Sequence, residues 1–518
     1  MKSIANTRVH FQNTKAGEKR SGKKQTIISV VILLMTSVVC ITICSKCSPI
    51  YPFNNWDDIN CFFTVGKAVA NDTVMYKEIF EQKGPLLYFL FSLAYFISND
   101  TFLGVYLIEI ILCFLFLLIS LKTIKLFSDD RIVYFVPLLA AIIYSSSAMS
   151  DGGSAEELCL PLIALCCYFG IRSLQRNTGI TLKEWFAVGV TSGIVLWIKF
   201  SLLGFYIGFG LYFLFFYLKS KRFKELFKAF LSLISGVFII SLPIFVYFAI
   251  NNAVSDLFTV YFYDNLFVYT VNKAGNFVLG FFVNLFYGSA SFVVCYTAGF
   301  VLSIAGAIFM ARQKKELLFF YLITFLFSFL LIYSGGRHFN YYSFTLSVYV
   351  PFGVLFIINI SKRFINKLNI NVNNKKMTVP LLSVLYILSA AFMFLLSPNT
   401  YMLKYKKDDL PQFKFNKIIS KTQSPTMLNY GFLDGGFYTV SDIMPTCKYF
   451  CKLNIPYEEM EKTQDQFVEN GLIDYVVTAG KQLDTARFNK YECVDKASFE
   501  EKKGGRRTYY LYRKTSME

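Results

Sequence analysis

Residues 54–85 read NNWDDINCFFTVGKAVANDTVMYKEIFEQKGP, a polar, acid-rich loop directly after the first membrane-length apolar run of the chain. The loop is predicted to lie at a bilayer surface, because an apolar run of about 20 residues can span a membrane. Ionisable groups so close to lipid are costly unless they are used. We therefore expect the chemistry of this protein in the loop, on its charged residues Asp57, Asp58, Glu78, Glu81 and Lys83.

The composition is that of a polytopic membrane protein. The 518 residues are 55% hydrophobic and 18% aromatic, more than is usual for a soluble domain. The net charge of +18 does not indicate a nucleic-acid partner, because the basic residues stand in short clusters between apolar runs, as in cytoplasmic loops. With only two His, the sequence argues against a His-based metal site or catalytic triad.

The apolar runs predict a helical membrane domain over residues 26–397, with about 11 to 13 transmembrane helices. The predicted spans are 27–47, 102–122, 132–148, 157–171, 183–198, 202–218, 229–250, 290–311, 316–334, 343–360 and 378–397. Two further apolar pieces, 84–98 and 276–289, are short for a crossing. We interpret both as juxtamembrane or re-entrant helices; the alternative is that both span.

The basic clusters orient these spans, because Lys and Arg concentrate in cytoplasmic loops. The basic tail 1–25 and five basic loops then fall on the cytoplasmic side; the loops contain Lys122, Arg172, Lys219, Arg312 and Lys362. The loops 48–84, 148–156, 251–277 and 335–342 fall on the outer side. A site on that face has no access to nucleotide-activated substrates, so its energy source is expected to be a lipid-linked donor.

Residues 398–518 change to a polar, mixed-charge composition and predict a small α/β domain outside the membrane. Apolar stretches at 427–432, 475–478 and 509–512 are typical of strands, and 457–470 is helix-like. Cys447, Cys451 and Cys493 lie here, and an exported domain would allow a disulfide among them.

Each candidate site residue has a structural alternative. Asp57 or Asp58 could act as a general base on an acceptor hydroxyl, or either could cap a helix. Lys83 could bind a phosphate with Glu78 or Glu81 orienting it, or these charges could form a weak interfacial ion pair.

The same holds for three later segments. Asp151 and Glu156 stand in a second acidic outer loop, where helix capping is the alternative to catalysis. Lys199 could contact a lipid phosphate or only extend to the membrane surface. Arg337 could stabilise a phosphate leaving group. Tyr341 and Tyr342 beside it could belong to the site or to an interfacial aromatic belt.

The order of these elements resembles the GT-C-fold glycosyltransferases, most closely the family 39 type. That family includes protein O-mannosyltransferases and the aminoarabinose transferase of lipid A. YKEIFEQKGPLLYFL (76–90) is similar to its Tyr-x-Asp/Glu…Lys-Pro/Gly-Pro-Leu signature. DGGSAEELCLPLI (151–163) resembles the Glu-Gly-Gly-Asn-x-Thr-Glu-Glu run of a bacterial subgroup, without its Asn-x-Thr portion. Two further departures are Gly84, where Lys-Pro-Pro is common, and Asn340, where a His often precedes the Tyr pair.

The resemblance implies an inverting transfer of a sugar from a polyprenyl-phosphate donor to a hydroxyl of a glycan, lipid or protein. The reaction would take place on the outer face of a bacterial inner or plasma membrane. The first-loop acid of the family matches Asp57 or Asp58, with Asp57 slightly preferred. Its Glu-x-Lys pair matches Glu81 and Lys83, and its second-loop acid matches Asp151 or Glu156.

Three questions stay open at this level. Two acidic loops that converge could hold a divalent metal, but a site based on Lys and Arg alone explains the residues as well. A lipid-linked glycan polymerase or ligase would use the same face of the membrane. A lipid or sugar transporter is a rival of another class, but it should place charges near the bilayer midplane, where Glu109 is the only acid deep in a predicted span.

Overall fold

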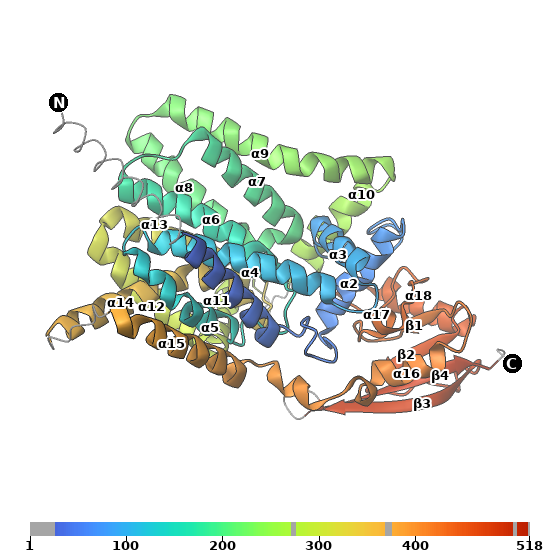
Figure 1. Ribbon diagram of the computed structural model, residues 1–518. Coiled ribbons are helices and arrows are strands. Elements are labelled where there is room, and N and C mark those ends of the chain that lie inside the picture. The colour runs from blue at the N-terminus through green and yellow to red at the C-terminus, as the bar shows by residue number, and fades with distance from the viewer. Residues whose placement is uncertain (1–25, 271–275, 368–374, 501–504, 516–518) are drawn as a thin grey trace, which may run out of the picture.

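The computed structural model describes residues 26–270, 276–367, 375–500 and 505–515. Long apolar helices form the larger part of the molecule, and a small domain with a β-sheet packs at one end of them (Figure 1). Within the described residues, eight helices are long and apolar enough to cross a membrane. The chain is an integral membrane protein, and the predicted fold class is confirmed. The predicted cytoplasmic tail 1–25 lies outside the described residues.

The membrane helices follow most of the predicted spans, because an uninterrupted apolar run in lipid must satisfy its backbone within a helix. They are the first helix Thr26–Cys44, α4 Leu103–Ile124, α5 Val136–Tyr144, α6 Ala155–Arg176, α7 Leu182–Lys199, α8 Gly204–Lys219, α9 Phe223–Ile250, α12 Thr297–Gln313, α13 Lys315–Tyr333, α14 Val350–Lys367 and α15 Lys375–Leu396. Short 3-10 segments precede α5, α8 and α14: η1 Asp130–Phe135, η2 Phe200–Leu203 and η4 Asn340–Tyr349.

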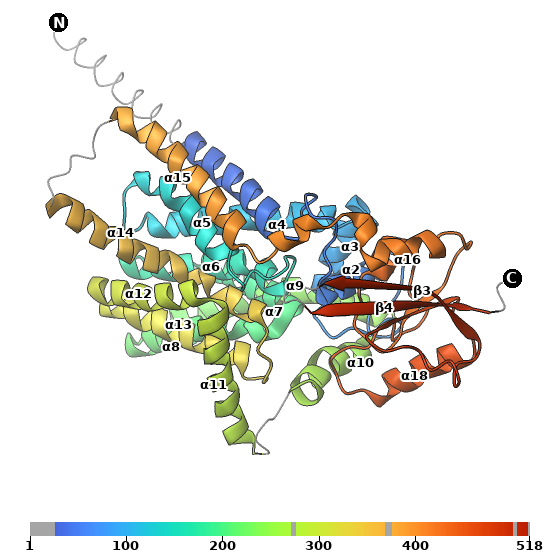
Figure 2. The ribbon, with the colours of Figure 1, turned by 90° about the horizontal axis from the view of Figure 1, so that it is seen from below.

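The predicted span 290–311 is wrong in its first part. The structure places the residues before Tyr296 in α11 (Phe277–Cys295), and α12 starts at Thr297. The prediction of a short juxtamembrane or re-entrant helix over 276–289 is also wrong, because this segment belongs to α11, whose residues Val278–Cys295 are long and apolar enough to cross a membrane. In Figure 2 α11 runs across the direction of α12 and α14 and points away from the bundle. The sequence does not indicate this break between the two helices, because the apolar run continues on both sides of it. The hydroxyl of Tyr296 is 2.8 Å from Oγ of Ser347, a tertiary contact that fixes this residue between the two helices.

The segment 48–98 contains two short helices, α2 (Asp57–Ala70) and α3 (Pro85–Ile97). They pack closely at Gly66, where an added Cβ would lie 2.6 Å from Cβ of Phe91. Oγ of Ser92 on α3 donates a 2.6 Å hydrogen bond to the carbonyl of Gly66. The helix α3 has 13 residues and is as short as predicted for the segment 84–98. On the same side of the bundle lie the short helix α10 (Val254–Asp256) and the π-helical segment η3 (Leu257–Val268).

The C-terminal domain contains a four-stranded sheet in the order β1-β2-β4-β3. β1 (Met427–Asn429) is parallel to β2 (Tyr475–Ala479), and the other two neighbouring pairs are antiparallel. β4 is Arg506–Lys514 and β3 is Tyr491–Glu500. The strand β3 was not predicted, since its sequence YECVDKASFE carries charges on both faces.

Three helices and two 3-10 turns complete this domain: α16 Pro411–Ile419, α17 Phe437–Ser441, α18 Glu458–Glu469, η5 Thr400–Lys404 and η6 Lys407–Asp409. The disulfide considered from the sequence is not formed, because Cys447, Cys451 and Cys493 are all free thiols. Cys447 and Cys451 are buried, whereas Cys493 lies on an exposed position of β3. Sγ of Cys451 instead lies 3.8 Å from Sγ of Cys61 on α2.

Candidate functional site

The first turn of α2 separates the two adjacent aspartates. Asp57 faces the C-terminal domain, where its Oδ2 lies 3.1 Å from the Arg507 guanidinium. Asp58 faces the membrane domain, where its Oδ2 accepts a 2.8 Å hydrogen bond from the hydroxyl of Tyr341. Neither provides the side-chain cap of this helix, whose N-cap residue is Trp56. The structure therefore brings Asp58, and not the slightly preferred Asp57, towards the other charged residues of the predicted site.

A second charged pair joins α6 to the end of α7. Nζ of Lys199 lies 2.5 Å from Oε1 of Glu156, and the Glu156 side chain is 1% exposed. The same ammonium group lies over the ring of Tyr342, 3.8 Å from its centroid, and 5.6 Å from that of Tyr341. Lys199 is thus held between a carboxylate and two aromatic faces, a setting that favours a cation.

Lys83 lies in the turn between α2 and α3, next to this pair. Its Nζ is 3.9 Å from Oε1 of Glu81, and its backbone N–H donates a 2.8 Å hydrogen bond to Oε2 of the same carboxylate. Burial alone would lower the pKa of Lys83, but the negative charges of Glu81, Asp58 and Glu156 raise it above its usual value. Burial raises the pKa of Glu81, and the neighbouring Lys83 partly opposes that shift. Lys83 therefore stays charged in a buried place.

The turn that contains Lys83 contacts α7 through Gly84. Its N–H donates a 3.1 Å hydrogen bond to the carbonyl of Ile198, directly before Lys199. An added Cβ on Gly84 would lie 2.1 Å from the carbonyl oxygen of Trp197. A proline here, as in the common Lys-Pro-Pro sequence, would have neither this N–H nor the room. Glycine at position 84, in place of the proline that is common there, therefore permits the close contact with α7 that puts Lys83 beside Lys199.

A cavity of about 290 Å³ opens beside these lysines. Lys83, Lys199 and Arg337 line it together with Tyr269 and Tyr342. Its apolar wall comes from α7, η3 and the end of α13, with Ile198, Leu266, Leu331 and Ile332. A cavity with several cations and an apolar side is suited to an anionic group that carries a hydrophobic chain.

Arg337 is fixed in the wall of this cavity. Its guanidinium stacks over the ring of Tyr269 at 4.6 Å, and Nη2 donates a 3.1 Å hydrogen bond to the carbonyl of Asn454 in the C-terminal domain. Its buried Nε has no hydrogen-bond partner among the described residues. Arg337 therefore contributes a cation to the wall of the cavity, with its position fixed by Tyr269 and the C-terminal domain.

Glu78 and Asp151, like Asp57, make their contacts away from the cavity. The side chain of Glu78 is exposed, and its Oε2 accepts a 2.7 Å hydrogen bond from the backbone N–H of Val74 in a turn. Asp151 pairs with Lys46 at 2.5 Å, and its carbonyl accepts from Nδ2 of Asn54 at 3.0 Å. The sequence could not distinguish these acids from the others, because all of them stand in the same two acidic loops.

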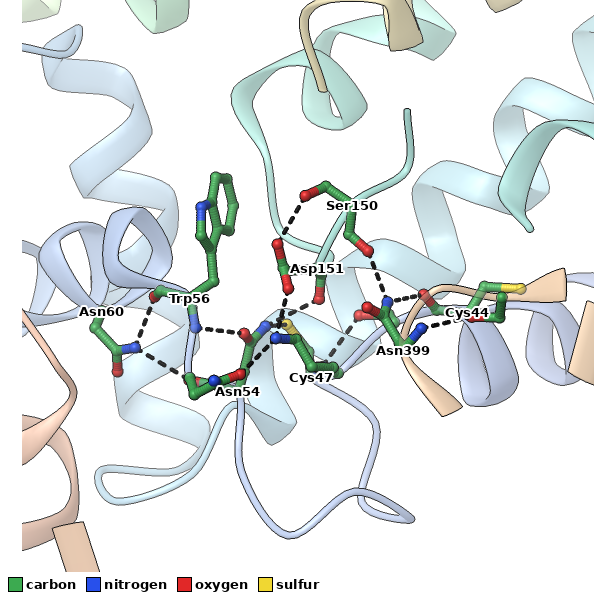
Figure 3. A network of polar contacts seen from close by, with 12 residues as sticks. Cys44, Cys47, Asn54, Trp56, Asn60, Ser150, Asp151 and Asn399 are labelled. Atoms are coloured by element: carbon green, nitrogen blue, oxygen red, sulfur yellow. Dashed lines mark hydrogen bonds and ion pairs between the residues drawn. The ribbon is translucent and has the colours of Figure 1, made fainter. Parts of the chain in front are cut away.

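Asp151 belongs to a network that joins three distant parts of the chain (Figure 3). The Oγ of Ser150 donates to Asp151, and Nδ2 of Asn399 donates to the carbonyls of Ser150 and Cys44. Nearby, Glu109 accepts hydrogen bonds from Oγ of Ser45 and, at 2.6 Å, from the N–H of Gly153. These contacts fix the two acidic loops to each other and to the beginning of the C-terminal segment.

The residues Tyr269 and Asn265 were missed from the sequence. Both line the cavity, and Nδ2 of Asn265 donates a 2.7 Å hydrogen bond to the carbonyl of Gln82 beside Lys83. They lie in or next to η3, within an aromatic segment that looks like any interfacial belt. No local signal could have separated them from their neighbours.

The described residues contain no group of three or more His, Cys, Asp or Glu side chains placed to hold a metal ion. Tyr341 links Asp58 of the first acidic loop to Lys199, because its hydroxyl donates to Asp58 and its ring centroid lies 5.6 Å from the Lys199 ammonium group. Lys199 in turn pairs with Glu156 of the second acidic loop.

Residues 82–247 match the family model described as dolichyl-phosphate-mannose-protein mannosyltransferase. Crystal structures of ArnT from Cupriavidus metallidurans share the whole architecture. The form bound to undecaprenyl phosphate has a TM-score of 0.61 and 12% identity, over 94% of this chain and 97% of that chain. The apo form has a TM-score of 0.62 and 10% identity, over 95% and 98%. A comparison with curated protein sequences gave no match.

These matches confirm the resemblance inferred from the sequence. The family model covers the segment that carries Lys83, Glu156 and Lys199. The structural likeness extends over both the membrane helices and the C-terminal domain, and at this identity it establishes the fold. The chain is a membrane protein with the GT-C glycosyltransferase fold.

Proposed function

We propose that this protein transfers a sugar from a polyprenyl-phosphate carrier to a hydroxyl group of a glycan, lipid or protein acceptor. The family match and the fold support a glycosyltransferase with a lipid-linked donor. The ArnT structure with undecaprenyl phosphate supports a carrier of that kind. We place the reaction on the extracytoplasmic face of a bacterial inner or plasma membrane, because the basic loops of the sequence mark the opposite face as cytoplasmic.

The observation that carries the proposal is the cavity lined by Lys83, Lys199 and Arg337. A polyprenyl-phosphate donor combines a phosphate with a long apolar chain, and the cavity combines these cations with an apolar wall. Arg337 lines this cavity, and guanidinium groups match phosphate oxygens in geometry. The apolar wall formed by η3 and α13 would take the first isoprene units.

The proposed chemistry is a single displacement with inversion at the anomeric carbon. Asp58 accepts the proton of the acceptor hydroxyl as its oxygen forms the new bond to that carbon. The bond from the anomeric carbon to the phosphate oxygen breaks, and its electron pair leaves with the polyprenyl phosphate. Lys83, Lys199 and Arg337 stabilise the negative charge on that leaving group. A phosphate needs no protonation to leave, so charge stabilisation is the main requirement on this side.

The hydrogen bond from Tyr341 gives Asp58 a fixed direction. Tyr341 also stacks edge-to-face on Trp56, with ring centroids 5.1 Å apart. The general base is thereby held at one end of α2 while the cations are held by the 81–84 turn, α7 and the loop before η4. Such fixed placement of both reacting partners contributes much of the rate enhancement in transfer reactions.

The proposal is tested by mass analysis of lipid-linked sugars and surface glycans in host cells. Cells without the protein should accumulate one polyprenyl-phosphate sugar and lose the matching sugar from one envelope product. Cells that express Asp58→Ala at the wild-type level should show the same change. Unchanged lipid-linked sugars and glycans in both strains would contradict a glycosyltransferase.

A further inference from the structure

The helix α2 presents two different faces to its surroundings. Asp58 points to Tyr341 and the membrane domain. Asp57, Cys61, Thr64 and Lys67 follow one another at helical spacing and all contact the C-terminal domain. Figure 1 shows α17 and the sheet of that domain next to α2. The helix that carries the proposed base is thus held on its other side by a separate domain.

Asp434 is the most buried charged residue in this interface. Its side chain has no exposure to solvent, and its Oδ2 accepts a 2.6 Å hydrogen bond from the hydroxyl of Thr64. Its Oδ1 accepts 2.9 Å hydrogen bonds from Nδ2 of Asn429 and from the N–H of Gly436. Two bonds therefore fix the carboxylate within its own domain, and the third reaches across to α2.

Further contacts extend the interface along α2. Nζ of Lys67 lies 2.5 Å from Oδ1 of Asp442, and Oγ1 of Thr439 lies 3.4 Å from Oδ1 of Asn60. Gly436 packs so closely that an added Cβ would lie 2.5 Å from the ring of Phe53. The contacts from Asp57 to Lys67 cover about three helical turns. They leave α2 little freedom to rotate about its axis.

We propose that Asp434 is a positioning residue for the transfer reaction: by holding Thr64, it fixes the rotation of α2 and so the direction of Asp58. This inference rests on the proposed role of Asp58 as the base. A rotation of α2 would swing Asp58 away from Tyr341 and from the anomeric carbon. Catalytic groups must be held to within about 0.5 Å and 10–20° of their working geometry, so a loose α2 would slow the reaction.

The proposed donor-binding cations lie on other elements. Lys83 is in the turn before α3, Lys199 ends α7, and Arg337 precedes η4. Loosening α2 should therefore slow transfer and leave the binding of the lipid carrier unchanged. A general loss of folding would damage both, so the two measurements together separate positioning from stability.

The test uses the full-length protein. Undecaprenyl phosphate serves as the probe for binding to protein in lipid nanodiscs. Transfer is measured as the initial rate of glycan formation in membranes from a host strain that lacks its own copy and supplies donor and acceptor. Thr64→Val and Asp434→Ala each remove one side of the cross-domain hydrogen bond. Asp434→Asn keeps the shape and retains an acceptor for Asn429 and Gly436. Asp408→Ala, at an exposed ion pair with Lys417, is the control in the same domain.

We expect Thr64→Val and Asp434→Ala to lower the transfer rate by about 10- to 100-fold, as small misplacements of catalytic groups do. Their affinity for undecaprenyl phosphate should stay within about two-fold of the wild type, which is below the effect of one lost charged contact. Asp434→Asn should restore most of the rate, and Asp408→Ala should not change it.

Asp58→Asn, measured in the same membranes, separates the inference from the function on which it rests. If Asp58→Asn abolishes transfer but Thr64→Val and Asp434→Ala keep the wild-type rate, only the positioning role is overturned. If both variants lose carrier binding as well as transfer rate, the positioning role is also overturned, in favour of a purely structural contact. Normal transfer by Asp58→Asn would overturn both the proposed base and its positioning.

Discussion

Nζ of Lys199, a residue in the wall of the cavity, lies 2.5 Å from Oε1 of Glu156, an ion pair that joins α7 to α6. Both side chains are largely withdrawn from solvent, at 13% and 1% exposure. Removing one partner should leave an unpaired buried charge. Glu156→Ala is therefore expected to lower the free energy of unfolding by about 3–5 kcal/mol.

The double variant Glu156→Ala/Lys199→Met checks the reason for that loss. It removes both charges, so it should recover much of the stability that the single variant loses. Unfolding in detergent by a chemical denaturant provides the comparison. A double variant as unstable as Glu156→Ala would show that the charge of Lys199 is not the cause.

Binding of undecaprenyl phosphate should depend on the lysines of the cavity. Lys83→Met and Lys199→Met each remove a charged contact to a phosphate, a contact usually worth about 1.5–3 kcal/mol. Each should therefore weaken binding by roughly 10- to 100-fold, measured on protein in nanodiscs.

Lys77→Met is the matched control, because Lys77 is exposed in the same acidic loop as Lys83 and its Nζ donates to the carbonyl of Asn251. It should bind the carrier like the wild type. Equal weakening of carrier binding by all three substitutions would indicate general attraction to a basic surface and would argue against a specific phosphate-binding site.

The transmembrane architecture was predictable, because long apolar runs in lipid leave the backbone few alternatives to a helix. The break at Tyr296 was not, since it lies inside an apolar run and depends on a tertiary contact with Ser347. The strand β3 was missed for a related reason. Its alternating pattern is obscured by charged residues, and pairing with β4 determines its conformation.

The candidate site was only partly predictable. The sequence predicted the acids and cations on the same face, but it could not say which of two adjacent aspartates turns towards the membrane domain. That choice depends on Arg507, which lies far along the chain and pairs with Asp57. Glu78 and Asp151 have the same chemical character as Glu81 and Glu156, and only their partners in space distinguish them. Tyr269 carries no sequence signal beyond its aromatic ring.

Gly84 should be intolerant of any side chain. Gly84→Ala would place a Cβ within 2.1 Å of the Trp197 carbonyl, so the turn would have to move away from α7 and take Lys83 with it. We expect a loss of about 1–3 kcal/mol in stability, as for other overpacked sites, together with weaker carrier binding.

Gly210→Ala in α8 provides the comparison, because no atom lies within 4 Å of its added Cβ. It should match or slightly exceed the wild type in stability, since Ala favours helix. Wild-type binding by Gly84→Ala would show that the turn tolerates displacement and that Lys83 is not held by this contact.

Stability should respond to pH through Asp434. Burial raises the pKa of this carboxyl from 3.8 to about 6, although Thr64, Gly436, Asn429 and Lys67 partly oppose the shift. The folded protein thus holds the proton more tightly than the unfolded chain. The stabilisation from this bound proton is fully present below the pKa that Asp434 has in the unfolded chain. It is lost as pH rises through the pKa that Asp434 has in the folded protein. Cys61, Cys451 and Tyr438 also face this group but stay neutral over that range, because burial raises the pKa of each.

Asp434→Asn lacks this proton equilibrium. Between about pH 4 and pH 7, the thermal unfolding midpoint of the wild type should fall relative to that of Asp434→Asn. A constant difference between the two proteins over this range would contradict the raised pKa of Asp434.

The central claim is that Asp58 is the base and that its neighbour Asp57 is not. The most direct test is the initial rate of sugar transfer in membranes that contain Asp58→Asn or Asp57→Asn at equal expression. Asp58→Asn should lower the rate by about 10²- to 10⁴-fold, the usual contribution of a general base. Asp57→Asn should stay within about five-fold of the wild type, because it loses only a partly exposed ion pair with Arg507. Near-normal transfer by Asp58→Asn, or an equal loss in both variants, would contradict the account.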